Sequence, residues 1–139
     1  MQPNEVILSV DELNDDTTTA DADYTYSRFE ENLNRSVYVG EGHTLTSRDT
    51  LALYRTFPTV NGNFKGVSKT SFKFTVDQGV DGVDGVSTLT APMIFEVKSS
   101  IPVGTSAAQI LIGRQKALAL LDRDDIMGPL NETLMIEHA

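Results

Sequence analysis

A long strand that passes almost directly into a helix is the strongest prediction from this sequence, and it lies between Ala91 and Leu121. From Met93 onward the side chains alternate between the two sides of an extended chain. One side carries Met93, Phe95, Val97, Ser99 and Ile101, and the other carries Ile94, Glu96, Lys98 and Ser100. A period of two residues with one apolar row is typical of a strand whose sheet has one buried face.

Residues with special backbone properties mark the end of this strand and the start of the helix. Pro102 has no N–H for a strand ladder, and Gly104 lets the chain turn. Thr105 or Ser106 can then accept hydrogen bonds from the first N–H groups of a helix. Apolar residues follow at helical spacing, namely Ala107, Ile110, Leu111, Leu118 and Leu121. Such a stripe packs on an apolar surface, and we expect the sheet of this chain or of a partner to supply it.

The composition excludes several classes of protein. The chain has 139 residues and no cysteine, so it has the length of one domain and forms neither disulfides nor cysteine-based zinc sites. No apolar run approaches the roughly 20 residues of a membrane helix. The first residues lack the basic start and apolar core of a signal peptide. We therefore expect a single soluble, intracellular domain, residues 1–139, without a membrane partner.

The formal net charge of −9 argues against a nucleic-acid partner, because neutralisation of phosphates is the main source of such affinity. The charges are unevenly placed, however. Acidic residues crowd the first part of the chain, whereas the segment from Thr50 to Val76 contains no acid and carries Arg55, Lys65, Lys69 and Lys73. A chain that is acidic as a whole can therefore still present a basic face.

Further strands are predicted before the long one. Short apolar or alternating runs occupy Glu5–Leu13, Asp23–Phe29, Ser36–Val39, Thr50–Phe57 and Ser68–Val76. The polar segment Asn14–Ala22 separates the first two runs, and the turn pair Asn61-Gly62 lies between the last two. After the long helix, Asp122–Asp125 is a charged break. A short second helix is predicted over Ile126–Leu134, with Gly128 and Pro129 at or near its start.

Strands that are segregated from helices indicate an α+β fold. We expect an antiparallel sheet of about six or seven strands, one long helix and one short helix near the C-terminus. Residues 1–22 would form a terminal strand and a polar segment, 23–103 the sheet, and 105–134 the helical region. One long helix and one short helix cover only part of such a sheet, so a second subunit is expected to cover the rest.

The polar row Lys69, Ser71, Lys73 and Thr75 is the main candidate for a functional site. Ammonium and hydroxyl groups on one strand face suit contacts to phosphates and bases, and Tyr54 is suited to stack on an unpaired base. Glu96 and Lys98 would extend the same surface. The alternative is an ordinary solvated sheet face, since antiparallel sheets often leave one side wet.

The segment from Asp77 to Gly85 repeats Val-Asp-Gly and is predicted to be a mobile loop. Calcium binding is the alternative, but the acid spacing does not match an EF-hand, because the twelfth position from Asp77 is Thr88 and not a glutamate. We find no nucleophile elbow and no phosphate-binding glycine loop before a helix. An enzyme, a cofactor and a metal site are therefore not expected.

The order of elements resembles the coat proteins of the single-stranded RNA bacteriophages, the leviviruses. The resemblance is strongest in IFEVKSSIPVGTSAAQILIGRQKALALLDRDDIMGPL and in the pair LALYRTFPT and SKTSFKFTV, and it covers about Tyr24 to Leu134. It implies an obligate intertwined homodimer in which the helices of each subunit pack over the partner's sheet. The dimers would assemble into an icosahedral shell, forming a virion in the cytoplasm of a bacterial host.

The resemblance also implies an RNA partner. The open sheet face of such coats turns inward to the single-stranded genomic RNA, and it binds a stem-loop that represses replicase translation. Carried over by position, the RNA-binding residues are Lys69, Ser71, Lys73, Tyr54, Thr56, Glu96 and Lys98, whereas Arg55 would point to the other side. The loop between the last strands would make inter-dimer contacts through Gly79, Asp81, Gly82, Asp84 and Gly85. The acidity of the chain and its segment Met1–Ala22 depart from the pattern.

Two alternatives share the same fold-level pattern. One is a small-ligand or peptide-binding α+β domain that uses an open sheet, and the other is a viral structural protein that assembles without nucleic acid. Assembly into a large closed particle distinguishes both structural proteins from the ligand-binding domain. Bound RNA then distinguishes the RNA-binding coat from a shell without nucleic acid.

Overall fold

The computed structural model describes residues 3–10 and 22–133, and these residues form two compact units. Of the described residues, the first unit contains 3–8 and 23–103, and the second contains 9–10, 22 and 104–133. The predicted ends of the first strand, Asp11–Leu13, and most of the polar segment after it lie outside the described residues. The two units are considered separately below.

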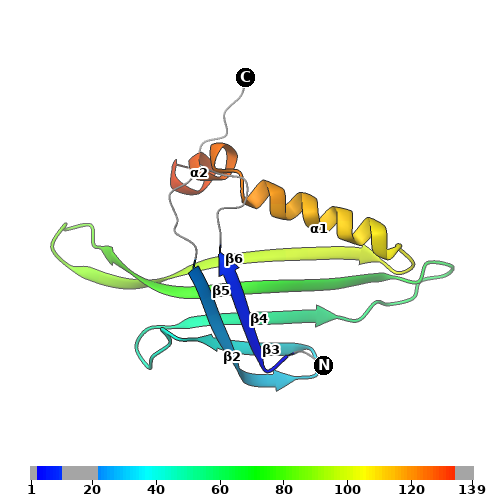
Figure 1. Cartoon of the computed structure of the whole chain (residues 1–139), viewed down its shortest axis with the longest axis horizontal. Coiled ribbons are helices and arrows are strands. Elements are labelled where there is room, and N and C mark those ends of the chain that lie inside the picture. The colour runs from blue at the N-terminus through cyan, green and yellow to red at the C-terminus, as the bar shows by residue number, and fades with distance from the viewer. Residues whose placement is uncertain (1–2, 11–21, 134–139) are drawn as a thin grey trace. The chain divides into compact units, whose positions relative to one another are not determined.

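The first unit is a six-stranded sheet in which each strand lies next to its neighbour in sequence, as Figure 1 shows. The strands are β1 (Glu5–Val10), β2 (Ala22–Asn32), β3 (Arg35–Gly40), β4 (Asp49–Thr56), β5 (Val67–Asp81) and β6 (Thr88–Pro102). The pairings from β2 to β6 are all antiparallel. Each of the six described strands overlaps a strand that was predicted from the sequence, and six is the lower of the two expected numbers of strands.

The core of the sheet lies on one face, which we call the core face. Tyr38 of β3 is completely buried, and Tyr26 and Leu51 are nearly so. Phe74 packs edge-on against Tyr26 with 5.9 Å between the ring centroids, and Phe72 packs against Phe74 at 5.8 Å. Val6 and Leu8 of β1 and Leu53 of β4 complete the cluster.

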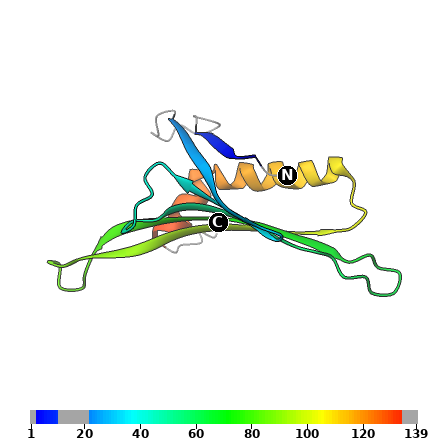
Figure 2. The same cartoon turned by 90° about the horizontal axis from the view of Figure 1, so that it is seen from below.

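The strands β1 and the first part of β2 bend away from the plane of β3–β6, as Figure 2 shows. The register of β2 against β3 shifts between Arg28 and Glu30, which is a β-bulge at Phe29. Because a bulge bends its strand, β1 can place Val6 and Leu8 on the core face. The hydroxyl of Tyr38 donates to the carbonyl of Pro3 at 2.7 Å, which ties the beginning of the described chain to β3.

The buried hydroxyl of Tyr26 forms a hydrogen bond with an acidic side chain of β4. Its hydroxyl donates to Oδ1 of Asp49 at 3.1 Å. Burial, followed by this hydrogen bond, raises the pKa of Tyr26 to about 12. Because the folded pKa exceeds the ordinary value of 10.0, this contribution to stability is complete below about pH 10 and is lost as the pH rises toward 12.

The prediction of a loop from Asp77 to Gly85 is wrong over its first half. β5 continues to Asp81, and its extension pairs with β6 from Asp77 opposite Pro92 to Asp81 opposite Thr88. The two long strands hydrogen-bond to each other, and this pairing outweighs the weak strand propensity of Asp and Gly. Pro92 is tolerated inside β6 because β6 is an edge strand of the sheet.

Only residues 82–87 remain outside the strands at this end of the hairpin. The Asp84 carboxylate accepts hydrogen bonds from the N–H groups of Val86 and Ser87, at 3.0 and 2.9 Å, and from the Ser87 hydroxyl at 2.7 Å. Gly82 donates to the carbonyl of Ser87 at 2.7 Å. The turn is therefore held by its own side chains rather than left without internal contacts.

The second unit contains helix α1 (Ala107–Leu121) and helix α2 (Asp124–Thr133). Ser106 caps α1 by accepting from the N–H of Gln109 at 3.3 Å, which confirms one of the two predicted caps. No residue of α1 is buried within one chain, and its apolar residues are spread around the helix rather than gathered in the predicted stripe. Neither α1 nor α2, in the part of the chain that the structure describes, is long and apolar enough to cross a membrane.

The predicted position of the Gly128-Pro129 pair is wrong, because Pro129 lies inside α2 rather than at its start. The helix begins two residues earlier than expected. The N–H groups of Ile126 and Met127 both donate to the carbonyl of Arg123, at 3.3 and 2.8 Å. The side chain of Arg123 also forms an ion pair with Asp125. These contacts form the first turn of α2 within the charged segment Asp122–Asp125, which was predicted to be a break between the helices.

The connection between β4 and β5 depends on a glycine, and this dependence can be tested. Gly66 has φ +94°, and a Cβ there would lie 2.5 Å from the carbonyl oxygen of Thr59. We expect Gly66→Ala to lower the free energy of unfolding by at least about 2 kcal/mol, since it combines backbone strain with a clash. The matched control is Gly62→Ala, which has φ +61° and nothing within 4 Å. It should cost only about 1 kcal/mol. Equal shifts of the urea midpoint in the two variants would contradict this account.

The turn between β5 and β6 generates a second prediction. Hydrogen bonds from the N–H groups of Ser87 and Val86, followed by the Ser87 hydroxyl, lower the pKa of Asp84 to about 2. Because the folded pKa is depressed, the stabilisation is complete above about pH 4 and is lost as the pH falls toward 2. Ser87→Ala removes one of the three donors and should raise this pKa part of the way to about 3.9, whereas Ser87→Thr should leave it low. NMR titration of the Asp84 carboxyl carbon measures this pKa. An ordinary pKa in the unmodified chain would contradict the hydrogen bonds described for this turn.

Candidate nucleic-acid interface

The strand register brings all seven predicted RNA-binding residues to one face of the sheet, opposite the core face. In β4 and β5, Tyr54 lies opposite Ser71 and Thr56 lies opposite Lys69. In β5 and β6, Ser71 lies opposite Lys98 and Lys73 lies opposite Glu96. We call this surface the polar face, and its residues are Arg35, Tyr54, Thr56, Lys69, Ser71, Lys73, Glu96, Lys98 and Ser100.

The polar face is basic although the whole chain has a net charge of −9. Around Tyr54 it carries four cations, Arg35, Lys69, Lys73 and Lys98, and one acid, Glu96, so the formal sum there is +3. The same register places Glu30, Asp77 and Asp81 toward the margins of this face. The Nζ of Lys98 lies 3.1 Å from Oε1 of Glu96, and the Lys98 side chain is 77% exposed. An exposed pair of this kind is worth only about 0–1 kcal/mol, so Lys98 can exchange Glu96 for a phosphate at little cost.

A hollow of about 420 Å³ lies at β4, β5 and β6, and six of its nine lining residues belong to the polar face, whereas Arg55, Thr70 and Ser99 alternate to the other side. Tyr54, Lys69 and Lys98 are among the lining residues from the polar face. The hydroxyl groups of Thr56, Ser71 and Ser100 are also among the lining groups. An aromatic ring next to cations and hydroxyls is the combination that binds one nucleotide of a single strand, because the ring stacks on the base and the ammonium groups contact its phosphate.

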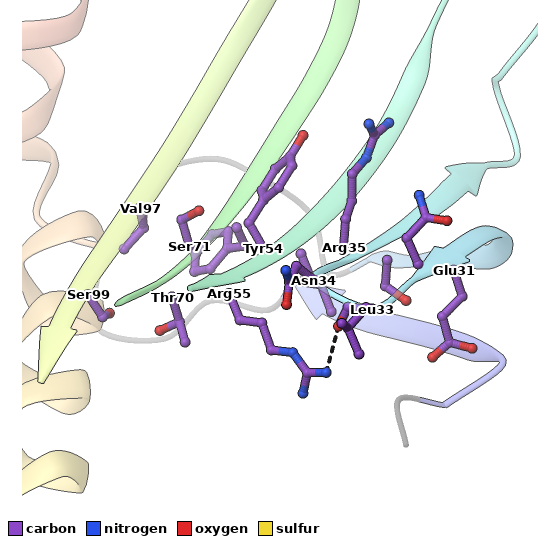
Figure 3. A pocket seen from close by; sticks show the side chains of 14 residues that line it. Glu31, Leu33, Asn34, Arg35, Tyr54, Arg55, Thr70, Ser71, Val97 and Ser99 are labelled. Atoms are coloured by element: carbon purple, nitrogen blue, oxygen red, sulfur yellow. Dashed lines mark hydrogen bonds between the residues drawn. The ribbon is translucent and has the colours of Figure 1, made fainter. Parts of the chain in front are cut away.

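Arg35 belongs to the polar face, and the sequence analysis missed it. It lies opposite Tyr54 in the pairing of β3 with β4, and its guanidinium carbon is 5.9 Å from the centroid of the Tyr54 ring. Figure 3 shows both side chains pointing to the same side of the sheet. A cation over the ring holds Tyr54 in place and adds a phosphate-binding group. The only signal in the sequence was the alternation of β3, which is too short to be placed against β4 without the register.

Arg55 points to the opposite side of the sheet, as the sequence analysis expected. Its guanidinium donates to the carbonyl of Leu33, and Figure 3 shows this contact on the side away from Tyr54. Leu33, Arg55, Thr70 and Val97 are among the residues that line a second hollow of about 630 Å³ near the turn between β2 and β3. Arg55 is thus engaged in holding that turn and is not part of the polar face.

The five residues that were predicted to make inter-dimer contacts separate into two groups. Gly79 and Asp81 lie in β5, whereas Gly82, Asp84 and Gly85 lie in the turn that follows. Among the described residues, no group of three or more His, Asp or Glu side chains is arranged to hold a metal ion. The Asp84 carboxylate is used by the hydrogen bonds of its own turn.

None of the described strands lies along the outer edge of β6. β6 is 15 residues long, and its side chains on the core face remain partly uncovered, with Met93 43% and Phe95 45% exposed. A long unpaired edge next to exposed apolar side chains is a site for association with another chain.

Comparison with known proteins identifies the fold. No family model and no curated protein sequence matches the chain. Thirty-one chains of solved structures do match. A chain from a virus-like particle of bacteriophage AVE019 has a TM-score of 0.76 at 19% identity, and the alignment covers 99% of this chain and 100% of that one. A chain from a virus-like particle of Beihai levi-like virus 21 has a TM-score of 0.70 at 12% identity over 100% of both chains.

A third match, from a virus-like particle of Wenzhou levi-like virus 4, has a TM-score of 0.67 at 19% identity and covers 94% of this chain and 84% of that one. These matches are too distant in sequence to carry over residue roles, but they span both units of the chain. They confirm the fold class that the resemblance implied. The chain therefore has the levivirus coat fold, in which an antiparallel sheet is followed by two C-terminal helices.

Proposed function

We propose that this chain is the coat protein of a single-stranded RNA phage, and that its copies assemble into an icosahedral shell around RNA. The full-length likeness to chains of levi-like virus-like particles supports the assembly. The observation that carries the RNA part is that Tyr54, Lys69 and Lys98 line one hollow and that Arg35 lies over the Tyr54 ring. The chain would accordingly be a component of the virion.

The building block of this shell is a homodimer formed through β6. Antiparallel pairing of two β6 strands would satisfy the N–H and C=O groups of both open edges and join two sheets into one. The exposed Met93 and Phe95 on the core face and the uncovered apolar residues of α1, such as Leu111 and Leu118, would find apolar cover in the second copy. Burying these side chains would stabilise the dimer by roughly 1.5–3 kcal/mol for each one that becomes fully covered.

The polar face would turn toward the RNA, because it brings four of the eleven basic residues of an acidic chain together around Tyr54. Lys69, Lys73 and Lys98 would contact phosphates, and Ser71 and Thr56 would donate hydrogen bonds to phosphate or base oxygens. Glu96, which lies opposite Lys73, would accept from the amino group of a base. The surplus of acid lies elsewhere in the chain, where it would keep the particle soluble.

The size of the hollow favours an unpaired base over a regular duplex. Tyr54 is 36% exposed, so its ring is accessible from the polar face. RNA loops present unstacked bases that aromatic side chains can bind. A stem-loop with such a base at the start of the replicase gene would thus be held by the coat dimer, and its translation would be repressed.

The net charge of −9 favours one other candidate, a shell that assembles without nucleic acid. The two functions differ in the contents of the particle. Purified particles that contain nuclease-protected RNA support the proposal, and particles that are always empty support the alternative. A chain that forms only small soluble species at every salt and protein concentration would contradict both.

Removal of two cations from the polar face should weaken RNA binding selectively. We expect Lys69→Ala/Lys73→Ala to reduce the RNA content of the particles and the affinity of the dimer for single-stranded RNA. Loss of two phosphate contacts would also lower the slope of log K against log salt by about 1.4. The matched control is Arg114→Ala/Lys116→Ala in α1, which changes the net charge equally, from −9 to −11. An equal loss of RNA in both variants would show that net charge, and not the polar face, holds the RNA.

Tyr54 gives an independent test, because it carries no charge. Tyr54→Ala should weaken binding of a single-stranded RNA to the dimer roughly 5- to 150-fold, which corresponds to the loss of about 1–3 kcal/mol of stacking. Tyr54→Phe keeps the ring and should bind nearly as well as the unmodified chain. Binding is measured by filter retention or fluorescence anisotropy at constant salt. If Tyr54→Ala binds as tightly as Tyr54→Phe, no base stacks on this ring.

A further inference from the structure

The two ends of the β5 strand carry opposite charge and are both apolar at the surface. The connection from β4 to β5, residues 57–66, has one cation, Lys65, and no acid. The connection from β5 to β6 lies in a segment, residues 77–88, that has three acids and no cation. Figure 1 shows these two connections at opposite ends of the sheet. The two ends of β5 thus present surfaces of opposite charge, which are complementary to each other.

The acidic surface, which we call the acidic tip, comprises residues 79–88. Its apolar side chains project into solvent, and Val83 and Val86 are almost completely exposed. Asp81 is exposed and has no hydrogen bond or ion pair to any described side chain, whereas the Asp84 carboxylate accepts hydrogen bonds from Val86 and Ser87. The turn is thus internally braced, so it loses little conformational entropy when its valines are covered.

The basic surface, which we call the basic loop, comprises residues 57–66. Phe57, Val60 and Phe64 are all at least half exposed, and Lys65 is exposed between Phe64 and Gly66. The loop is also braced. The N–H of Asn61 donates to the carbonyl of Phe64 at 2.9 Å, and the N–H of Phe64 donates back at 3.0 Å. The guanidinium of Arg55 lies 5.0 Å from the centroid of the Phe57 ring, which keeps a cation beside the apolar patch.

One chain cannot bring its own two surfaces together. β5 has 15 residues, which separates its ends by roughly 50 Å at a rise of about 3.3 Å per residue. We propose that the acidic tip of one copy binds the basic loop of another copy, with Val83 and Val86 against Phe57, Val60 and Phe64, and with Asp81 opposite Lys65. A contact between two different patches propagates from copy to copy and closes when the rotation allows. This inference rests on the proposed shell, and it assigns the lateral contact that links its subunits.

Charge reversal with rescue tests this pairing. Lys65→Glu and Asp81→Lys should each abolish or strongly reduce particles in size-exclusion chromatography and electron microscopy, because like charges would then face each other. The chain that carries both substitutions restores an opposite pair in every contact and should assemble again. Lys116→Glu, which makes the same charge change in α1, should assemble normally. Particles from either single variant at the unmodified level, or failure of the double variant to assemble, would overturn the pairing.

Cross-linking gives a direct geometric test, because the chain contains no cysteine. A variant with Phe64→Cys and Val83→Cys should form a ladder of disulfide-linked multimers on a non-reducing gel after mild oxidation of assembled particles. Chains with Phe64→Cys alone or Val83→Cys alone should stay monomeric on the same gel. Dimers from Val83→Cys alone would mean that acidic tips meet each other, and this result would overturn the proposal.

The outcomes also distinguish this inference from the proposed function. If the unmodified chain forms no particles, the shell itself is wrong and the lateral contact falls with it. The unmodified chain could instead form particles while the single charge reversals still assemble and the double-cysteine variant gives no ladder. In that case only the lateral contact is wrong.

Discussion

The register of β4, β5 and β6 is the constraint on which the rest of the structure depends. It places Leu51, Phe74 and Phe95 in one row across three strands. Because side chains alternate strictly, a slip of one residue would exchange the lysines of β5 with its phenylalanines. The completely buried Tyr38 and the packing of Phe74 on Tyr26 oppose such a slip. The core therefore fixes the positions of the side chains on the polar face, although it does not touch RNA.

One sheet can in this way serve several partners at once. Its core face and the free edge of β6 are suited to a second copy of the chain, and its polar face is suited to single-stranded RNA. The two ends of β5 add surfaces of opposite charge. A chain that is acidic overall can therefore present a basic region, because four cations and one acid, Glu96, lie around Tyr54 on the polar face while most of the 20 acids lie elsewhere.

Much of the fold was predictable, because alternation in β5 and β6 is a local signal that carries directly into the sheet. The seven candidate RNA-binding residues share one face for the same reason. Other features depend on partners that are distant in the sequence. The extension of β5 through Asp81 is stabilised by β6, and Arg35 joins the polar face only through the pairing of β3 with β4. The early start of α2 depends on the carbonyl of Arg123. Local propensity cannot reveal any of these contacts.

Cryo-electron microscopy of the purified particles tests the central claim most directly, since one map shows the shell, the orientation of the sheet and the RNA. The account predicts a closed shell with the polar face on the inside, and density for RNA next to Tyr54, Lys69 and Lys98. A shell with the polar face outward, or one with ordered RNA only at other surfaces, would contradict the account.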